Sequence, residues 1–146
     1  MNLMLNTQIL APAAVLVAWS MVMTVWVVVT RFPAFKAAGI DLSEAPPGGR
    51  YPDVEPAMPP RVNWVAHNYN HLMEQPTIFY PLVVILAITG APDAAIWWAW
   101  AYTGFRVLHS LWQALVNTVP TRFALFMCSN VCLFALTWYA LRMTLG

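Results

Sequence analysis

Residues 9–30 read ILAPAAVLVAWSMVMTVWVVVT and contain no charged side chain. A helix of this length crosses a bilayer hydrocarbon core of about 30 Å. No basic segment precedes the apolar run, so we expect a retained membrane helix at about 8–31 and not a cleaved signal peptide. This first segment therefore predicts an integral membrane protein.

The composition of the remaining chain extends this expectation. Of its 146 residues 60% are hydrophobic and only 9% are charged, against about 25% charged in soluble domains. The stretches 75–92 and 123–141 are also free of charge, and 93–121 contains only Asp93 and Arg106. We therefore predict a single all-α domain, an antiparallel up-down four-helix membrane bundle. The expected spans are about 8–31, 61–90, 93–118 and 121–143.

A long connection separates the first two spans. Residues 32–60 hold most of the twelve prolines, which predicts an irregular loop. Basic residues gather on the loop side of the bundle, whereas only Arg142 lies on the other. The positive-inside rule then predicts a cytoplasmic loop with both termini outside, in a membrane such as the bacterial inner membrane. The loop-side residues are Arg31, Lys36, Arg50, Arg61 and Arg122.

Polar side chains recur at helical spacing in the second span. Asn63, His67, Asn70 and Glu74 follow one another at intervals of four, three and four residues, and His71 flanks them. At 100° per residue the first four share one helix face.

A second stripe runs along the third span, formed by Tyr102, Arg106, His109, Gln113 and Asn117. Arg106 and Glu74 of the second span lie at matching depths from the loop side. A charge in the bilayer interior costs at least about 2.5–3.5 kcal/mol unless it is sheltered. We therefore expect Glu74 and Arg106 to be neighbours, within one chain or across a subunit boundary.

Two interpretations of these stripes remain open. Asn, His and Gln side chains could join the helices by hydrogen bonds, or they could line a concave polar site reached from water. The number of polar groups favours a site. His67 and His71 form only a weak metal-ligand pattern, and Cys128 and Cys132 share an apolar helix face, so we expect no metal. A net charge of +1 gives no indication of nucleic-acid binding.

Arg122 follows Pro120 at the expected start of the fourth span. It could anchor the helix at the membrane surface, or it could bind an anion beside the positive end of the helix dipole. A thiol held there would have a lowered pKa and would form the nucleophilic thiolate.

Two segments resemble a known family. These are AHNYNHLMEQPTIFY at 66–80 and RVLHSLWQALVNTVPTR at 106–122. They are similar to motifs of the membrane-associated proteins in eicosanoid and glutathione metabolism (MAPEG), with a Glu shortly before a Pro in the second span and an Arg and a Pro-x-Arg turn in the third. Bacterial members share this pattern, and the order and topology of the segments strengthen the resemblance.

The resemblance implies a homotrimer that binds glutathione between neighbouring subunits. By position, Glu74 would meet the glutathione amino group, Arg106 and His109 would line the groove, and Arg122 would act catalytically by activating the thiol. The implied cofactor-binding set is Asn70, His71, Glu74, Tyr102, Arg106, His109 and Gln113. The chain departs from the usual pattern at His67, His71 and Gln113, where Arg, Asn and Tyr are common in the family.

We therefore expect a membrane-bound glutathione-dependent transferase or peroxidase. Its substrates would be lipophilic electrophiles or lipid hydroperoxides from the surrounding membrane lipids. The alternative is a non-enzymatic scaffold or accessory subunit whose polar stripe binds a lipid headgroup or a partner helix.

Overall fold

The computed structural model describes residues 5–146, and within that range the protein is all-α with no strand. The all-α prediction is confirmed. Three helical segments are long and apolar enough to cross a membrane, Thr7–Ala37, Pro60–Thr89 and Val119–Leu145. Helix α5 (Asp93–Leu115), the predicted third span, is not among them. Its interior contains Arg106, His109 and Gln113, which lower its apolar character.

Helix α1 (Leu10–Ala37) follows a short 3-10 turn, η1 (Thr7–Ile9). The helix continues beyond the predicted end near residue 31 and contains Pro33 in its last turns. Asn6 fixes the start of the helix, because its side-chain Nδ2 donates to the carbonyl of Ala91 over 2.8 Å and its backbone N–H donates to that of Ala87 over 3.0 Å. These bonds attach the beginning of α1 to the end of a later helix.

The connection from 38 to 59 is less irregular than predicted, since it holds three short helical turns. They are η2 (Leu42–Glu44), α2 (Tyr51–Val54) and η3 (Glu55–Ala57). The guanidinium of Arg31 lies 3.6 Å above the ring of Tyr51, a cation–π contact that holds α2 against the end of α1.

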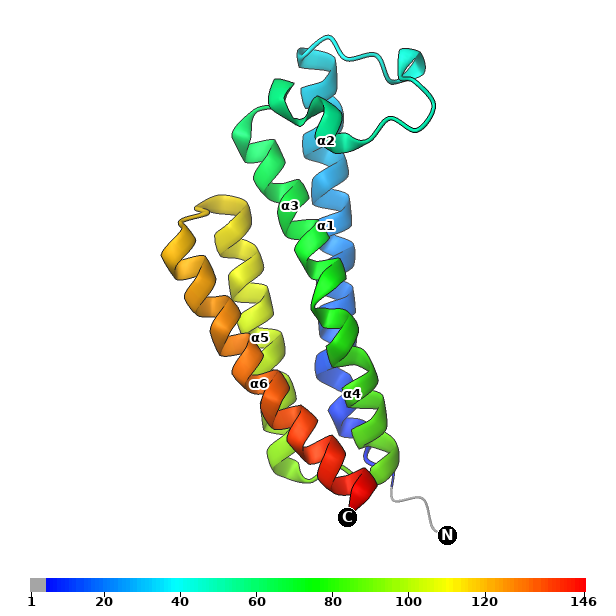
Figure 1. The fold of residues 1–146 in the computed structure, drawn as a ribbon, viewed down its shortest axis with the longest axis vertical. Helices are drawn as coiled ribbons and strands as arrows, with labels where there is room; N and C mark the ends of the chain where they lie inside the picture. Colours follow the sequence, from blue (N-terminus) through cyan, green and yellow to red (C-terminus); the bar gives the residue numbers. More distant parts are fainter. Residues whose placement is uncertain (1–4) are drawn as a thin grey trace.

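The second long segment consists of α3 (Pro60–Glu74) and α4 (Pro76–Thr89), which continue one another through Gln75 (Figure 1). Pro76 has no backbone N–H to donate to the preceding turn, which explains the interruption. Helix α4 ends at Gly90, whose φ of 84° is the left-handed conformation that terminates helices.

Helices α5 and α6 (Val119–Leu145) are joined by a tight turn. The backbone N–H groups of Val116 and Asn117 both donate to the carbonyl of Trp112, over 2.9 and 2.7 Å. Asn117 has a φ of 56°, and Asn tolerates this left-handed conformation better than most residues. The turn therefore places the start of α6 next to the end of α5.

The long helices lie lengthwise against one another (Figure 1). Helix α1 packs on α3, α4 and α5, and α6 packs on α5 and α4. The 38–59 connection lies at one end of the molecule, here called the loop end, and the start of α1 lies with the end of α6 at the other. Fully buried apolar side chains fill the interior, and large ones such as Phe134 and Trp138 are exposed outside. The buried set includes Leu16, Met23, Phe79, Leu86 and Leu136.

Candidate functional site

Arg106 is fully buried at the centre of the molecule. Its Nη1 donates to Oε1 of Gln75 over 2.9 Å, and its Nη2 donates to the backbone carbonyl of His71 over 2.8 Å. Both acceptors lie at the interruption between α3 and α4. At this point Pro76 has no backbone N–H, so one hydrogen bond of the helix is missing. Arg106 therefore joins α5 to the end of α3 and to the residue that links α3 with α4.

The structure contains no ion pair between Glu74 and Arg106 within residues 5–146. The Glu74 side chain is exposed, and the ion pair in this part of the chain joins His67 to Glu55. Arg106 has no exposed surface in the single chain, and its pairing with Glu74 of a neighbouring subunit stays a prediction. At 100° per residue the neighbouring position, Gln75, is the one that faces α5.

The two predicted stripes differ in their placement. On α5, Tyr102, Arg106, His109 and Gln113 are buried, as a face packed inside the bundle would be. On α3, by contrast, His67, Asn70 and Glu74 are exposed on the outer surface of the chain. Two polar residues of α3 face inward. His71 stacks on His109 of α5, and Asn68, which the spacing argument missed, is fully buried.

Asn68 belongs to a buried hydrogen-bonded node that joins three helices. Its Nδ2 donates to Oγ of Ser110 over 2.7 Å, and Nε1 of Trp19 donates to the same oxygen over 2.9 Å. Asn68 and Ser110 have no exposed surface. This node fixes α1, α3 and α5 relative to one another, and so supports the residues one turn further along α3.

Next to this framework, the structure contains a pocket of about 240 Å³ between α3, α5 and α6. We call it the Arg122 pocket. Its lining residues are His71, His109, Val119, Arg122, Phe123 and Phe126. The imidazole rings of His71 and His109 stack with centroids 5.1 Å apart. Two of the predicted site residues therefore lie in one wall, with Arg122 in another.

Arg122 is held at the beginning of α6. Its Nη1 donates to Oδ1 of Asn117 over 2.7 Å, and its backbone N–H donates to the carbonyl of Thr118 over 3.1 Å. The guanidinium has further N–H groups that can donate to a ligand. An anion in the pocket would meet a fixed cation close to the positive end of a helix dipole.

Several buried polar atoms near this pocket have no hydrogen-bond partner among residues 5–146. They include Nδ1 of His71, Nε of Arg106, Oε1 of Gln113 and the hydroxyl of Tyr102. His71 lines the pocket, so its nitrogen can serve a bound ligand. Tyr102 and Arg106 are fully buried, so in this conformation they support the site from behind. Tyr102 stacks on Phe79 with ring centroids 4.3 Å apart.

The same residues offer little to a metal ion. Within the described chain, no three His, Cys, Asp or Glu side chains gather as a metal site requires. His71 and His109 present a two-nitrogen pair only.

These features describe an integral membrane protein with a small polar pocket built around one arginine. The MAPEG family model matches residues 9–142, nearly the whole chain, and the chain belongs to the MAPEG family. No curated protein and no solved structure shows a significant match to the sequence.

Proposed function

We propose that the chain is a membrane-bound, glutathione-dependent transferase or peroxidase. Its substrates would be lipophilic electrophiles or lipid hydroperoxides. The observation that carries this proposal is the position of Arg122, fixed by Asn117 in a pocket shared with His71 and His109. Membership of the MAPEG family supports glutathione as the thiol.

Arg122 has the properties that a thiol-activating residue needs. A permanently charged guanidinium beside a helix N-terminus favours the thiolate over the thiol. Bound glutathione would supply that thiolate as the nucleophile for a carbon electrophile or as the reductant of a peroxide bond. Phe123 and Phe126 line the same pocket, and their aromatic side chains would limit water around a bound sulfur.

The residues present fit an acidic tripeptide that also carries an amino group. His71 offers an unpartnered buried Nδ1 in the pocket, and His109 lies against it. One helical turn further along α3, the exposed carboxylate of Glu74 suits the glutathione amino group, with Asn70 beside it. Gln113, Tyr102 and Arg106 are buried and would support this wall from behind.

The exposure of Glu74 and Asn70 supports the homotrimer implied by the family. Both side chains are on a helical segment apolar enough to span the membrane, where a charge facing lipid costs at least about 2.5–3.5 kcal/mol. A neighbouring subunit would cover this surface and close the groove. We propose four antiparallel spans, with α5 as the third. We also propose that the loop end is cytoplasmic and that the membrane is a bacterial inner membrane.

The second candidate is a non-enzymatic scaffold or accessory subunit. The same exposed stripe of His67, Asn70 and Glu74 favours it, because polar groups on a spanning helix can also meet a lipid headgroup or a partner helix.

A thermal-shift titration with glutathione in detergent separates the two candidates. Ligand at about one hundred times its Kd stabilises the folded state by about 2.7 kcal/mol. We expect such a shift for the unmodified protein and for Arg142→Ala, since Arg142 is exposed at the far end of α6. The shift should vanish in Arg122→Ala.

Flat melting curves for all three proteins at millimolar glutathione would overturn the enzyme proposal and favour the scaffold. Equal shifts in Arg122→Ala and Arg142→Ala would show that glutathione binds without Arg122.

A further inference from the structure

His71 is a half-buried histidine in the wall of the Arg122 pocket. Its imidazole packs on two other rings, with centroids 5.1 Å from that of His109 on α5 and 5.6 Å from that of Phe126 on α6. The guanidinium of Arg106 donates to its backbone carbonyl over 2.8 Å. The backbone and the ring of His71 are therefore both held in place before any ligand enters.

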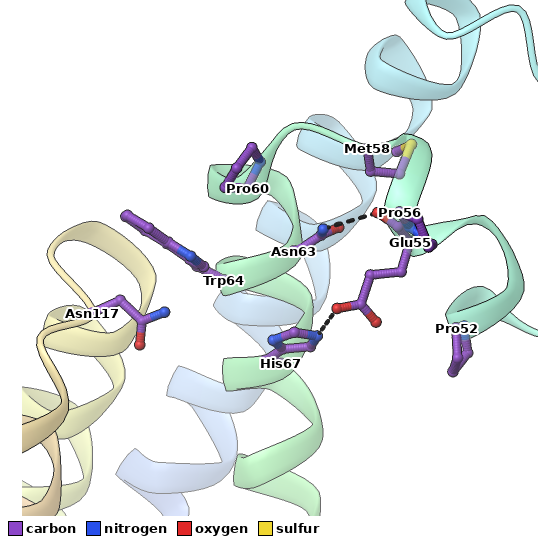
Figure 2. A pocket seen from close by; sticks show the side chains of 9 residues that line it. All are labelled: Pro52, Glu55, Pro56, Met58, Pro60, Asn63, Trp64, His67 and Asn117. Carbon is purple, nitrogen blue, oxygen red and sulfur yellow. Dashed lines mark hydrogen bonds and ion pairs between the residues drawn. The ribbon is translucent and has the colours of Figure 1, made fainter.

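The ring of His71 has hydrogen-bonding capacity that the described part of the chain does not use. Its Nδ1 is buried and has no partner there, although a neutral imidazole carries one donor and one acceptor nitrogen. The other histidines are placed differently. His109 is almost fully buried, and His67 is paired with Glu55 over 2.7 Å at the loop end, outside this pocket (Figure 2). His71 is thus the histidine that a reactant in the Arg122 pocket can reach.

Among the side chains that line the pocket, an imidazole can hold a proton and give it back near neutral pH. Arg122 can stabilise a thiolate, but its guanidinium is already fully protonated and cannot take a proton. The same holds for Arg106, which faces His71 from α5. Glu74, on the same helix as His71, is exposed on the outer surface of the chain and does not line the pocket. A proton released by a bound thiol therefore has His71 as its acceptor within the pocket.

We propose that His71 is a catalytic proton carrier for the reduction of hydroperoxides, which keeps the proton of the glutathione thiol in the pocket and delivers it to the leaving oxygen. This inference rests on the proposed function and adds a chemical role for one residue of its site. The role matters for a hydroperoxide because the leaving alkoxide is strongly basic and needs a proton. A weakly basic leaving group such as chloride departs without one.

His71 acts twice in one turnover of this reaction. The thiol proton moves to its imidazole as the thiolate forms beside Arg122. The sulfur then attacks the outer oxygen of the hydroperoxide, so that an S–O bond forms and the O–O bond breaks. The electron pair of the O–O bond leaves with the alkoxide, which takes the proton from the His71 imidazolium and becomes the alcohol. The sulfur is oxidised to a sulfenic acid, and the thiol of a second glutathione converts it to the disulfide with release of water.

His71→Asn tests the proton transfer, because Asn is polar but cannot carry a proton at neutral pH. The full chain in detergent is assayed with glutathione and either cumene hydroperoxide or 1-chloro-2,4-dinitrobenzene. We expect kcat/KM for the hydroperoxide to fall by at least about a hundredfold, as general acid–base catalysis is lost. In this variant the thiol proton passes to water and the thiolate still forms beside Arg122. The kcat/KM for the aryl chloride and the glutathione thermal shift should therefore stay close to those of the unmodified protein.

His71→Ala provides a second variant, because it leaves space for a free base where the half-buried ring was. Added imidazole should restore hydroperoxide reduction in His71→Ala. Pyrazole, a ring of the same size but a far weaker base, should not restore it. Equal restoration by the two compounds would show that the ring only fills space, and it would overturn the inference.

The remaining outcomes keep this inference separate from the proposed function. Full hydroperoxide reduction in His71→Asn, or an equal loss of both reactions, would overturn the role of His71 and leave the glutathione-dependent enzyme in place. An unmodified protein that conjugates the aryl chloride but does not reduce the hydroperoxide would do the same. An unmodified protein with no glutathione shift and neither reaction would refute the proposed function, and the role of His71 with it.

Discussion

Arg106 donates from Nη2 to the backbone carbonyl of His71 across 2.8 Å, so a fully buried cation of α5 caps the end of α3. The same guanidinium donates to the Gln75 side chain on the other side of the interruption. One side chain thus holds the junction of α3 and α4 on α5 and fixes the backbone of His71, which lines the Arg122 pocket.

Replacing Arg106 by Ala should destabilise the protein through the loss of these hydrogen bonds. The carbonyl of His71 would lose the donor from Arg106, and Oε1 of Gln75 would keep only the long hydrogen bond of 3.4 Å from the Ser129 hydroxyl. A buried group left unpaired costs about 1–3 kcal/mol. We expect the free energy of unfolding, measured by titration from mild detergent into sodium dodecyl sulfate, to fall by at least about 2 kcal/mol. Arg61→Ala, an exposed arginine at the loop end, should change it by less than about 0.5 kcal/mol. Equal stability of the two variants would show that these hydrogen bonds do not stabilise the protein.

Glu74→Gln distinguishes a structural carboxylate from a ligand-binding one. Glu74 is exposed and makes no ion pair in this chain, so the unliganded protein should keep its stability within about 0.5 kcal/mol. The glutathione-induced thermal shift should become smaller, because the carboxylate is proposed to meet the amino group. A large loss of unliganded stability with a normal glutathione shift would reverse both assignments.

Asn68 and Asn70 form a matched pair on α3, one buried and one exposed. Asn68→Ala removes a hydrogen bond to Ser110 and leaves a small cavity, so it should lower the free energy of unfolding by about 1–2 kcal/mol. Asn70→Ala should have almost no effect on unfolding. Detergent titrations of the two variants side by side measure the difference, and a greater loss in Asn70→Ala would mean that α3 is rotated from the orientation described.

The sequence predicts α5 better than α3, for a physical reason. Spacing of four, three and four residues groups polar side chains on one face of either helix. In a membrane, however, apolar residues cover both the inner and the outer surface, so hydrophobic periodicity does not tell which face is inside. The α5 stripe is buried, whereas His67, Asn70 and Glu74 are exposed and Asn68 faces inward.

Other features depend on contacts that no local pattern specifies. Charge-free runs place α1 and α6, but α1 continues to Ala37, past Arg31 and Pro33, where the composition predicts a loop. The η3 turn folds back on α3 through the ion pair of Glu55 with His67. A proline-rich composition predicts that a loop is present, but it does not predict the surface on which the loop packs.

Asp41 provides a local test of the 38–59 connection. Its Oδ1 accepts hydrogen bonds from the backbone N–H of Ser43 over 2.8 Å and from the Ser43 hydroxyl over 2.7 Å. These two hydrogen bonds hold the pKa of the Asp41 carboxyl below its usual value of 3.8, and the bond from the Ser43 hydroxyl has the larger effect. Because the folded loop favours the ionised carboxylate, Asp41 stabilises the fold at pH values above its usual pKa. This stabilisation is lost as the pH falls through the lowered pKa of the folded state. The NMR chemical shift of the Asp41 carboxyl carbon, followed against pH, should show a lowered pKa in the unmodified protein. In Ser43→Ala this pKa should return toward the usual value. The same pKa in both proteins would exclude the hydrogen bond from the Ser43 hydroxyl as its cause.

Asn117 combines a backbone role with a side-chain role, and two substitutions separate them. Its φ of 56° is unfavourable for Ala but not for Gly, so Asn117→Ala should lower the free energy of unfolding by about 1–2 kcal/mol while Asn117→Gly stays close to the unmodified protein. Both variants remove the Oδ1 atom that accepts from Arg122. If that bond positions the guanidinium for a thiol, the glutathione shift should fall by a similar amount in Asn117→Gly and Asn117→Ala, despite their different stabilities. A full shift in Asn117→Gly would mean that the backbone of the turn positions Arg122 without the Asn117 side chain.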